Sequence, residues 1–117
     1  MTSLFRSVVL LIKIIGMEKS LGTLLRECRH KRNLLLREVA AAIGIDQAIL
    51  SKYETDKRLP TKEQVALLSK FYEDTTRVIT IAYLSDKMAE ELKDEDLAFK
   101  VMQVAEEKIK YKKINKK

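Results

Sequence analysis

The chain has 117 residues, of which 46% are hydrophobic and 34% charged, a size and composition that fit one domain with a modest buried core. Three glycines, one proline and no tryptophan leave few residues that interrupt helices, so the composition predicts an all-α fold with short turns. A single cysteine excludes an internal disulfide, and a single histidine leaves no partner set for a metal site.

The net charge of +6 is distributed unevenly along the chain. Residues 17–60 have a net charge of +3, residues 61–107 have −5, and residues 108–117 contain six lysines and no acidic residue. A basic first half suits a polyanionic partner, although a run of charge is more often a solvated surface.

Residues 1–16 differ in composition from the rest of the chain, because the stretch from Val8 to Ile15 is apolar except for Lys13. This stretch is far shorter than the ~20 residues that a membrane span requires, so we expect no membrane partner. Three interpretations stay open: an extension upstream of a true start at Met17, a β-prone arm that pairs with another chain, or an export signal.

Apolar residues recur every three or four positions from Ser20 onward, which predicts a series of helices. The expected ranges are 20–33, 36–43, 47–55, 61–71, 76–92 and 96–113. Asn33 can take the left-handed conformation that closes the first helix. Asp46 is the expected N-cap of the third helix, and Thr61 that of the fourth, where Gln64 completes a capping box.

The helix, turn and helix over residues 34–55 form the most informative stretch. Gly44 lets the chain reverse between the two helices, and Leu50 and Tyr53 are the expected inward anchors of the second one. The opposite face of that second helix carries amide, small, hydroxyl and amine groups, namely Gln47, Ala48, Ser51 and Lys52. Such groups can bond base edges in a major groove, which admits one helix braced by the helix before it. The pattern therefore predicts base contacts by these four residues.

A wider set of residues in the range 21–72 surrounds this stretch. It comprises Leu21-Gly22, Arg29, Glu38-Val39-Ala40, Gly44-Ile45-Asp46-Gln47, Leu50-Ser51-Lys52-Tyr53-Glu54 and Lys57-Arg58-Leu59-Pro60-Thr61. Together these residues resemble the Cro and phage-repressor type of helix-turn-helix, the XRE family. The resemblance implies an all-α fold in which a five-helix Cro/repressor-like DNA-binding domain is followed by one additional C-terminal helix.

The resemblance also implies roles for single residues. Phosphate contacts are expected from the end of the recognition helix and the basic turn that follows it, at Thr55, Lys57 and Arg58. Ile49 is expected to face outward, toward a thymine methyl group or a sugar. A structural ion pair between Arg29 and Glu54 is expected to join the first helix to the end of the recognition helix.

Two departures from the family pattern affect these expectations. Leu35 and Leu36 stand where the family usually has a polar cap and a phosphate-binding glutamine, so that backbone contact does not carry over. Asp56 stands where glycine is common, a position that aspartate tolerates at a modest energetic cost.

The predicted domain covers residues 17–72, and helices over 73–113 follow it, before a short basic tail at 114–117. These later helices are apolar on one face and rich in glutamate on the other. We expect them to form a homodimer that places two recognition helices about 34 Å apart on an inverted repeat of double-stranded DNA. A docking surface for a second protein and a monomeric extension of the core are the alternatives.

The sequence contains no Ser-His-Asp or Cys-His set, no glycine-rich phosphate loop and no metal-ligand cluster, so no catalysis and no cofactor are expected. The sequence therefore predicts a cytoplasmic, homodimeric, DNA-binding repressor. The alternatives are an antitoxin or a restriction-modification controller protein that regulates its own gene, and a protein-interaction module that does not bind DNA.

Overall fold

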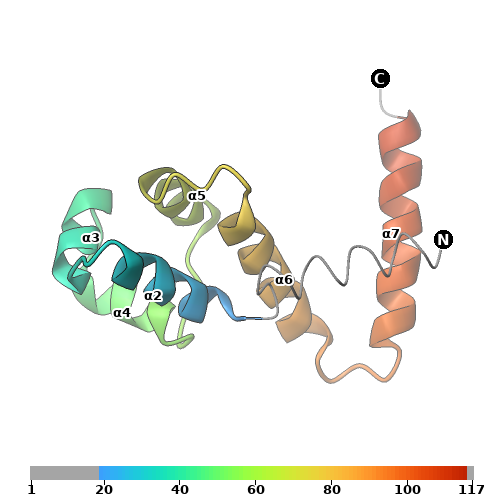
Figure 1. The fold of residues 1–117 in the computed structure, drawn as a ribbon. Coiled ribbons are helices and arrows are strands. Elements are labelled where there is room, and N and C mark those ends of the chain that lie inside the picture. The colour runs from blue at the N-terminus through green and yellow to red at the C-terminus, as the bar shows by residue number, and fades with distance from the viewer. Residues whose placement is uncertain (1–18, 116–117) are drawn as a thin grey trace. The chain divides into compact units, whose positions relative to one another are not determined.

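The computed structural model describes residues 19–115, and the regular structure of these residues is entirely helical (Figure 1). The helices are α2 (Leu21–Lys31), α3 (Leu36–Ile43), α4 (Gln47–Glu54), α5 (Lys62–Phe71), α6 (Val78–Leu92) and α7 (Ala98–Asn115). The expected all-α architecture is confirmed: five helices, α2 to α6, are followed by one more, and every helix begins and ends within two residues of its predicted range. The interpretations of residues 1–16 concern a segment outside the described residues.

Contacts along the chain divide it into two compact units, Met1–Lys87 and Met88–Lys117. The first unit contains α2 to α5 and most of α6, and it holds the hydrophobic core. The second unit contains the end of α6, a turn and α7.

Three helices of the first unit begin at polar side chains that accept hydrogen bonds from the first turn. Ser20 caps α2, where its hydroxyl oxygen accepts the N–H of Thr23 at 3.2 Å. Asp46 caps α4 as expected, and the capping box of α5 is present, because Thr61 and Gln64 each accept the backbone N–H of the other at 3.2 Å. These caps satisfy donors that have no partner inside a helix.

Four helices of the first unit end at a residue in the left-handed conformation. The residues are Asn33, Gly44, Asp56 and Glu73, with φ angles of 54°, 73°, 61° and 53°. The residue after each one donates its N–H to a carbonyl five positions back, for example Leu34 to Arg29 at 3.2 Å and Lys57 to Lys52 at 2.9 Å. This pattern is a Schellman ending, which satisfies carbonyls left without partners at the helix end.

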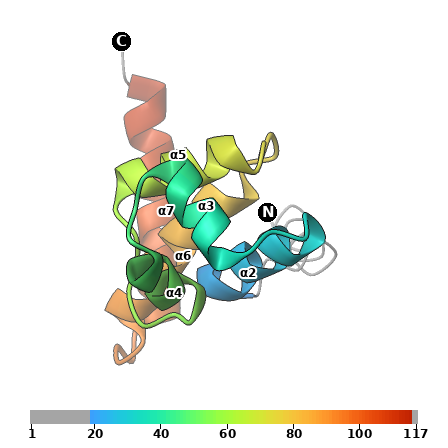
Figure 2. The same cartoon turned by 90° about the vertical axis from the view of Figure 1, so that its left-hand side faces the viewer.

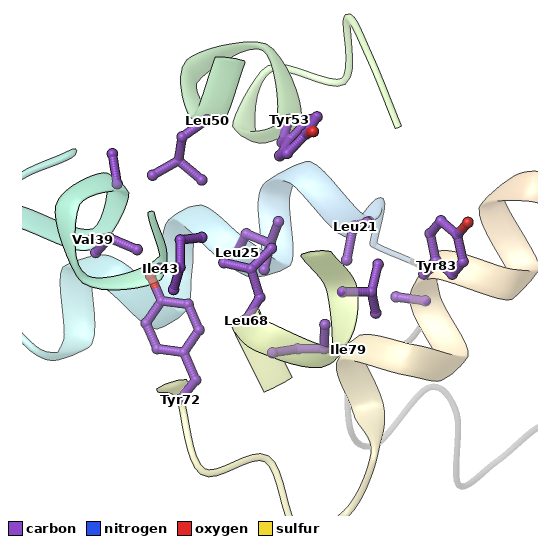
Figure 3. Packing of buried hydrophobic residues seen from close by; sticks show 13 residues of the cluster. Leu21, Leu25, Val39, Ile43, Leu50, Tyr53, Leu68, Tyr72, Ile79 and Tyr83 are labelled. Carbon is purple, nitrogen blue, oxygen red and sulfur yellow. The ribbon is translucent and has the colours of Figure 1, made fainter. Parts of the chain in front are cut away.

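The core brings together side chains from every helix of the first unit (Figure 3). Its most deeply buried members are Leu21, Leu25, Val39, Leu50, Leu68 and Ile79. Figure 3 shows Leu21 facing Ile79 and Tyr83 of α6, which places the start of α6 against the start of α2. Helix α6 is therefore part of the same core as α2 to α5.

The N-terminus of α2 is held by two carboxylates that are distant in sequence. The N–H of Leu21 donates to Asp86 of α6 at 2.8 Å, and the N–H of Gly22 donates to Asp56 at 3.0 Å. Asp56 also accepts the hydroxyl of Ser20 at 2.6 Å. Negative charge at a helix N-terminus is stabilised by the helix dipole, so these contacts tie α4 and α6 to α2.

Several apolar residues of α5 and α6 are exposed rather than buried in the core. In α6 the core takes Ile79, Ala82 and Tyr83. The exposed residues are Leu67 of α5 and Ile81, Leu84 and Met88 of α6. A helical face as broad as theirs is buried only where a neighbouring helix covers it, so these four side chains lie outside the core.

Tyr72 places a polar group in the core without a visible partner. Its side chain is buried, and its hydroxyl makes no hydrogen bond within the described part of the chain. Burial, followed by the nearby charge of Glu54, raises the pKa of Tyr72 to about 12. The neutral phenol is thus the form that the folded state favours.

Tyr72→Phe is expected to raise the free energy of unfolding at pH 7 by about 1 kcal/mol, because it removes a desolvated hydroxyl that gains no bond. A raised pKa contributes stability that is complete below the ordinary tyrosine value of about 10 and is lost as the pH rises to about 12. The phenylalanine variant lacks this loss, so its advantage over the native chain should grow between these pH values. Urea unfolding at pH 8, 10 and 11 measures both effects. A variant less stable than the native chain at every pH would show that the hydroxyl is well bonded.

Candidate nucleic-acid interface

The turn between α3 and α4 determines where α4 begins. Gly44 adopts a φ of 73°, and an added Cβ there would meet nothing within 4 Å, so the backbone angle alone favours glycine. Ile45 then packs partly against the core. Asp46 accepts the N–H of Ala48 at 2.7 Å, which closes the first turn of α4.

Helix α4 has one buried and one exposed face (Figure 2). Leu50 and Tyr53 are almost completely buried, as expected. Gln47, Ala48 and Lys52 are exposed, and Ser51 is partly exposed. Figure 2 shows α3 and α4 together on one side of the first unit, so α4 is supported from behind and open in front.

Ile49 departs from the expectation that it faces outward. It is only partly exposed and packs against the core. The part of this side chain that it still presents to solvent is an apolar edge rather than a whole side chain.

A basic turn follows α4. Thr55 is exposed, and its hydroxyl donates to the carbonyl of Ser51 at 2.8 Å, so its proton is already engaged by the helix. Lys57 and Arg58 are exposed, and neither forms an ion pair with any described residue. The same holds for Lys52, which leaves three unpaired cations on and after α4.

Arg29 and Glu54 meet inside the first unit. The guanidinium donates to both carboxylate oxygens, at 2.9–3.1 Å, and to the carbonyl of Leu34 at 3.1 Å. The Glu54 side chain is 4% exposed and that of Arg29 is 14% exposed. The hydrogen bond to Glu54 raises the pKa of Arg29 above its ordinary value. The pair connects the end of α2 to the end of α4 and so orients the exposed face of α4.

The start of α3 has an apolar cap position. Leu35 is 49% exposed and its side chain accepts no hydrogen bond, although its N–H donates to the carboxylate of Glu38 at 2.7 Å. Leu36 packs partly against the core. Arg37 in this turn is exposed and forms no ion pair with any residue that the structure describes, and the sequence interpretation did not select it. Its position in the sequence could have indicated it, because Arg37 directly follows Leu35 and Leu36, which stand where the family has polar residues.

The helix-turn-helix family model matches residues 25–76. These residues are a helix-turn-helix domain. The domain is of the XRE/Cro type, as the resemblance in the sequence implied, and a helix-turn-helix domain of this type implies DNA binding. No curated protein and no solved structure gave a significant match to the chain.

The match extends four residues beyond the end expected from the sequence, as far as Thr76. The added residues form the α5–α6 turn of the helix-turn-helix domain. Asp74 in that turn accepts the N–H of Ile79 at 2.7 Å, so it caps the beginning of α6. The turn therefore links the domain to the helix that completes its core.

Three further features bear on other kinds of site. Burial raises the pKa of the Cys28 thiol, so this cysteine is protonated at neutral pH and is a poor nucleophile. Within residues 19–115, no group of three or more histidine, cysteine, aspartate or glutamate side chains is placed to hold a metal ion. Over the same residues, no helix combines the length and the apolar character needed to cross a bilayer.

Proposed function

We propose that this protein is a sequence-specific regulator of transcription that binds an inverted-repeat operator as a homodimer and acts as a repressor in the cytoplasm. The observation that carries the proposal is the exposed face of α4, which presents polar and basic side chains without partners among residues 19–115, while Leu50 and Tyr53 fix the other face. A helix held in this way can enter a major groove as a rigid body.

In this proposal the residues of α4 and of the turn after it have separate tasks. Gln47, Ala48, Ser51 and Lys52 contact base edges, and Ile49 adds an apolar contact through its exposed edge. Lys57, Arg58 and Thr55, once its hydroxyl proton turns from Ser51 to a phosphate oxygen, contact phosphates, which supplies affinity that depends on salt but carries little sequence information. The Arg29–Glu54 pair holds the recognition helix in place and does not contact DNA.

The homodimer part of the proposal rests on residues 73–113. Ile81, Leu84 and Met88 recur along the exposed side of α6 at intervals of three and four residues. An apolar stripe of this kind typically marks a protein-protein interface. Repression follows most simply if the bound dimer blocks polymerase.

The double substitution Gln47→Ala with Lys52→Ala tests the reading face. It is expected to weaken binding to the selected operator by tenfold or more, because each well-placed base contact contributes about 1–3 kcal/mol of discrimination. The operator is first selected from random-sequence duplexes, and binding isotherms are then recorded at two salt concentrations.

Glu63→Ala with Lys70→Ala is the control, since it truncates a lysine and a side chain of glutamine's length at exposed positions on α5, outside the residues assigned to the homodimer. The control is expected to retain operator affinity. Full affinity and selectivity in the α4 variant would refute the assigned reading face. Failure of the native chain to enrich any sequence, at either salt concentration, would instead favour a protein-interaction module.

A further inference from the structure

Helix α7, together with Leu97 just before it, carries a stripe of exposed apolar side chains within the described part of the chain. Leu97, Val101, Val104 and Tyr111 are 60%, 44%, 53% and 69% exposed, and their spacing places them on one side of the helix. No residue of α7 is buried. An isolated helix of 18 residues is only marginally stable in water, because most helical stability in proteins comes from burying one face. A partner that covers this apolar stripe would therefore stabilise α7.

The charges of the second unit are segregated along the chain. Residues 90–96 contain five acidic residues and one lysine, whereas residues 108–113 contain four lysines and no acidic residue. We call these stretches the acidic segment and the basic segment. Within the described residues, four of the acids and three of the lysines form no ion pair, namely Glu91, Asp94, Glu95, Asp96, Lys108, Lys112 and Lys113.

The two segments of one chain cannot neutralise each other while α7 is intact. A helix rises 1.5 Å per residue, so Lys110 lies about 18 Å along the axis from Ala98. Lys110 instead contacts Glu106 and Glu107 on its own helix, at 3.4 and 3.6 Å. A second copy of this chain carries opposite charges that match both segments at once.

We propose that α7 of one chain pairs antiparallel with α7 of a second copy, so that each basic segment lies against the acidic segment of the partner. The proposal rests on the homodimer of the proposed function and adds its interface and orientation. Val101 of each chain then packs on Val104 of the other near the two-fold axis, a self-complementary arrangement.

This register also explains the lysine that interrupts the apolar stripe. Lys108 occupies the stripe position between Val104 and Tyr111. In the antiparallel register it lies opposite Leu97 of the second copy, where its aliphatic stem covers the leucine and its ammonium group reaches the acidic segment. A parallel pair places acid against acid and lysine against lysine, which is repulsive, so charge selects the antiparallel pair.

Charge reversal tests the pairing. One variant replaces Lys108, Lys112 and Lys113 with Glu, and a second replaces Glu91, Asp94 and Glu95 with Lys. Each alone is expected to raise the dissociation constant of the dimer at least about tenfold, because several attractive pairs become repulsive. An equimolar mixture is expected to recover a dimer, since each variant then meets opposite charge at both ends. Sedimentation equilibrium at low salt measures the masses, and circular dichroism confirms that each variant is helical.

Cross-linking tests the orientation in a Cys28→Ser background. Glu95→Cys mixed with Lys110→Cys is expected to give mixed disulfides in preference to disulfides between identical chains. Preferred Lys110→Cys homodimers would indicate a parallel pair and overturn the proposal, as would a monomeric native chain. A lysine-reversal variant that stays dimeric but loses DNA affinity would assign the basic segment to DNA and also overturn it. If α4 did not bind DNA, the proposed function would fail but the masses from sedimentation equilibrium would be unchanged. A failure of the proposed function is therefore distinguishable from a failure of the α7 pairing.

Discussion

Glu54→Ala is expected to lower the free energy of unfolding by about 3–5 kcal/mol, a large part of the stability of a domain of this size. The substitution leaves the guanidinium of Arg29 buried, with only the carbonyl of Leu34 as a remaining acceptor. The loss comes mainly from the uncompensated charge and less from the attraction of the pair itself. Urea denaturation followed by circular dichroism measures it.

Two variants separate this explanation from a general sensitivity of the fold. Glu27→Ala removes the carboxylate of the exposed Lys19–Glu27 pair, in which both side chains are more than 40% exposed, and is expected to cost less than about 1 kcal/mol. Arg29→Met combined with Glu54→Leu removes both charges and is expected to recover much of the stability lost in Glu54→Ala. If Glu54→Ala cost no more than Glu27→Ala, the buried pair would have no structural importance.

Gly22→Ala is the second substitution with a large expected effect. A Cβ at this position would lie 2.5 Å from the Asp56 carboxylate and 2.6 Å from the backbone carbonyl of Tyr53. Helix α2 must then move away from the end of α4, which disturbs the packing of Leu21 and the bond from the Gly22 N–H to Asp56. We expect a loss of about 2–3 kcal/mol, although alanine is the better helix former by about 1 kcal/mol.

Thermal and urea unfolding of Gly22→Ala are compared with those of Arg26→Ala, an exposed change in the same helix that should stay within about 0.5 kcal/mol of the native chain. Adding Asp56→Gly to Gly22→Ala removes the side-chain clash but leaves the clash with the carbonyl of Tyr53. Only partial recovery is therefore expected. Native-like stability of Gly22→Ala alone would contradict the close approach of α2 and α4.

Much of the fold was predictable because its signals are local. The capping box of Thr61 and Gln64, the cap at Asp46 and the reversal at Gly44 each depend on residues within a few positions of one another. Such signals operate before any tertiary contact forms, so they appear directly in the sequence. The two faces of α4 were predictable for the same reason, since helical periodicity places Leu50 and Lys52 on different sides of the helix.

The candidate site was predictable in composition but less so in detail. Gln47, Ala48 and Lys52 are exposed as their helical positions indicate. Ile49 is partly covered, and Arg37 joins the exposed cations at the start of α3. Whether a side chain at the edge of a helical face is covered depends on the angle at which the neighbouring helices cross that helix. The periodicity of the sequence does not predict this crossing angle.

By itself, the sequence determined the helices, their caps and the polar character of the outer face of α4, because spacing and capping chemistry act over one or two turns. Only the tertiary structure decided that Asp56 and Asp86 hold the N-terminus of α2, across 34 and 65 residues of chain. It also decided that Ile81 and Leu84 stay exposed while Ile79 is buried. Burial and long-range hydrogen bonds depend on which surfaces meet, and that is a property of the packed helices together rather than of any one segment.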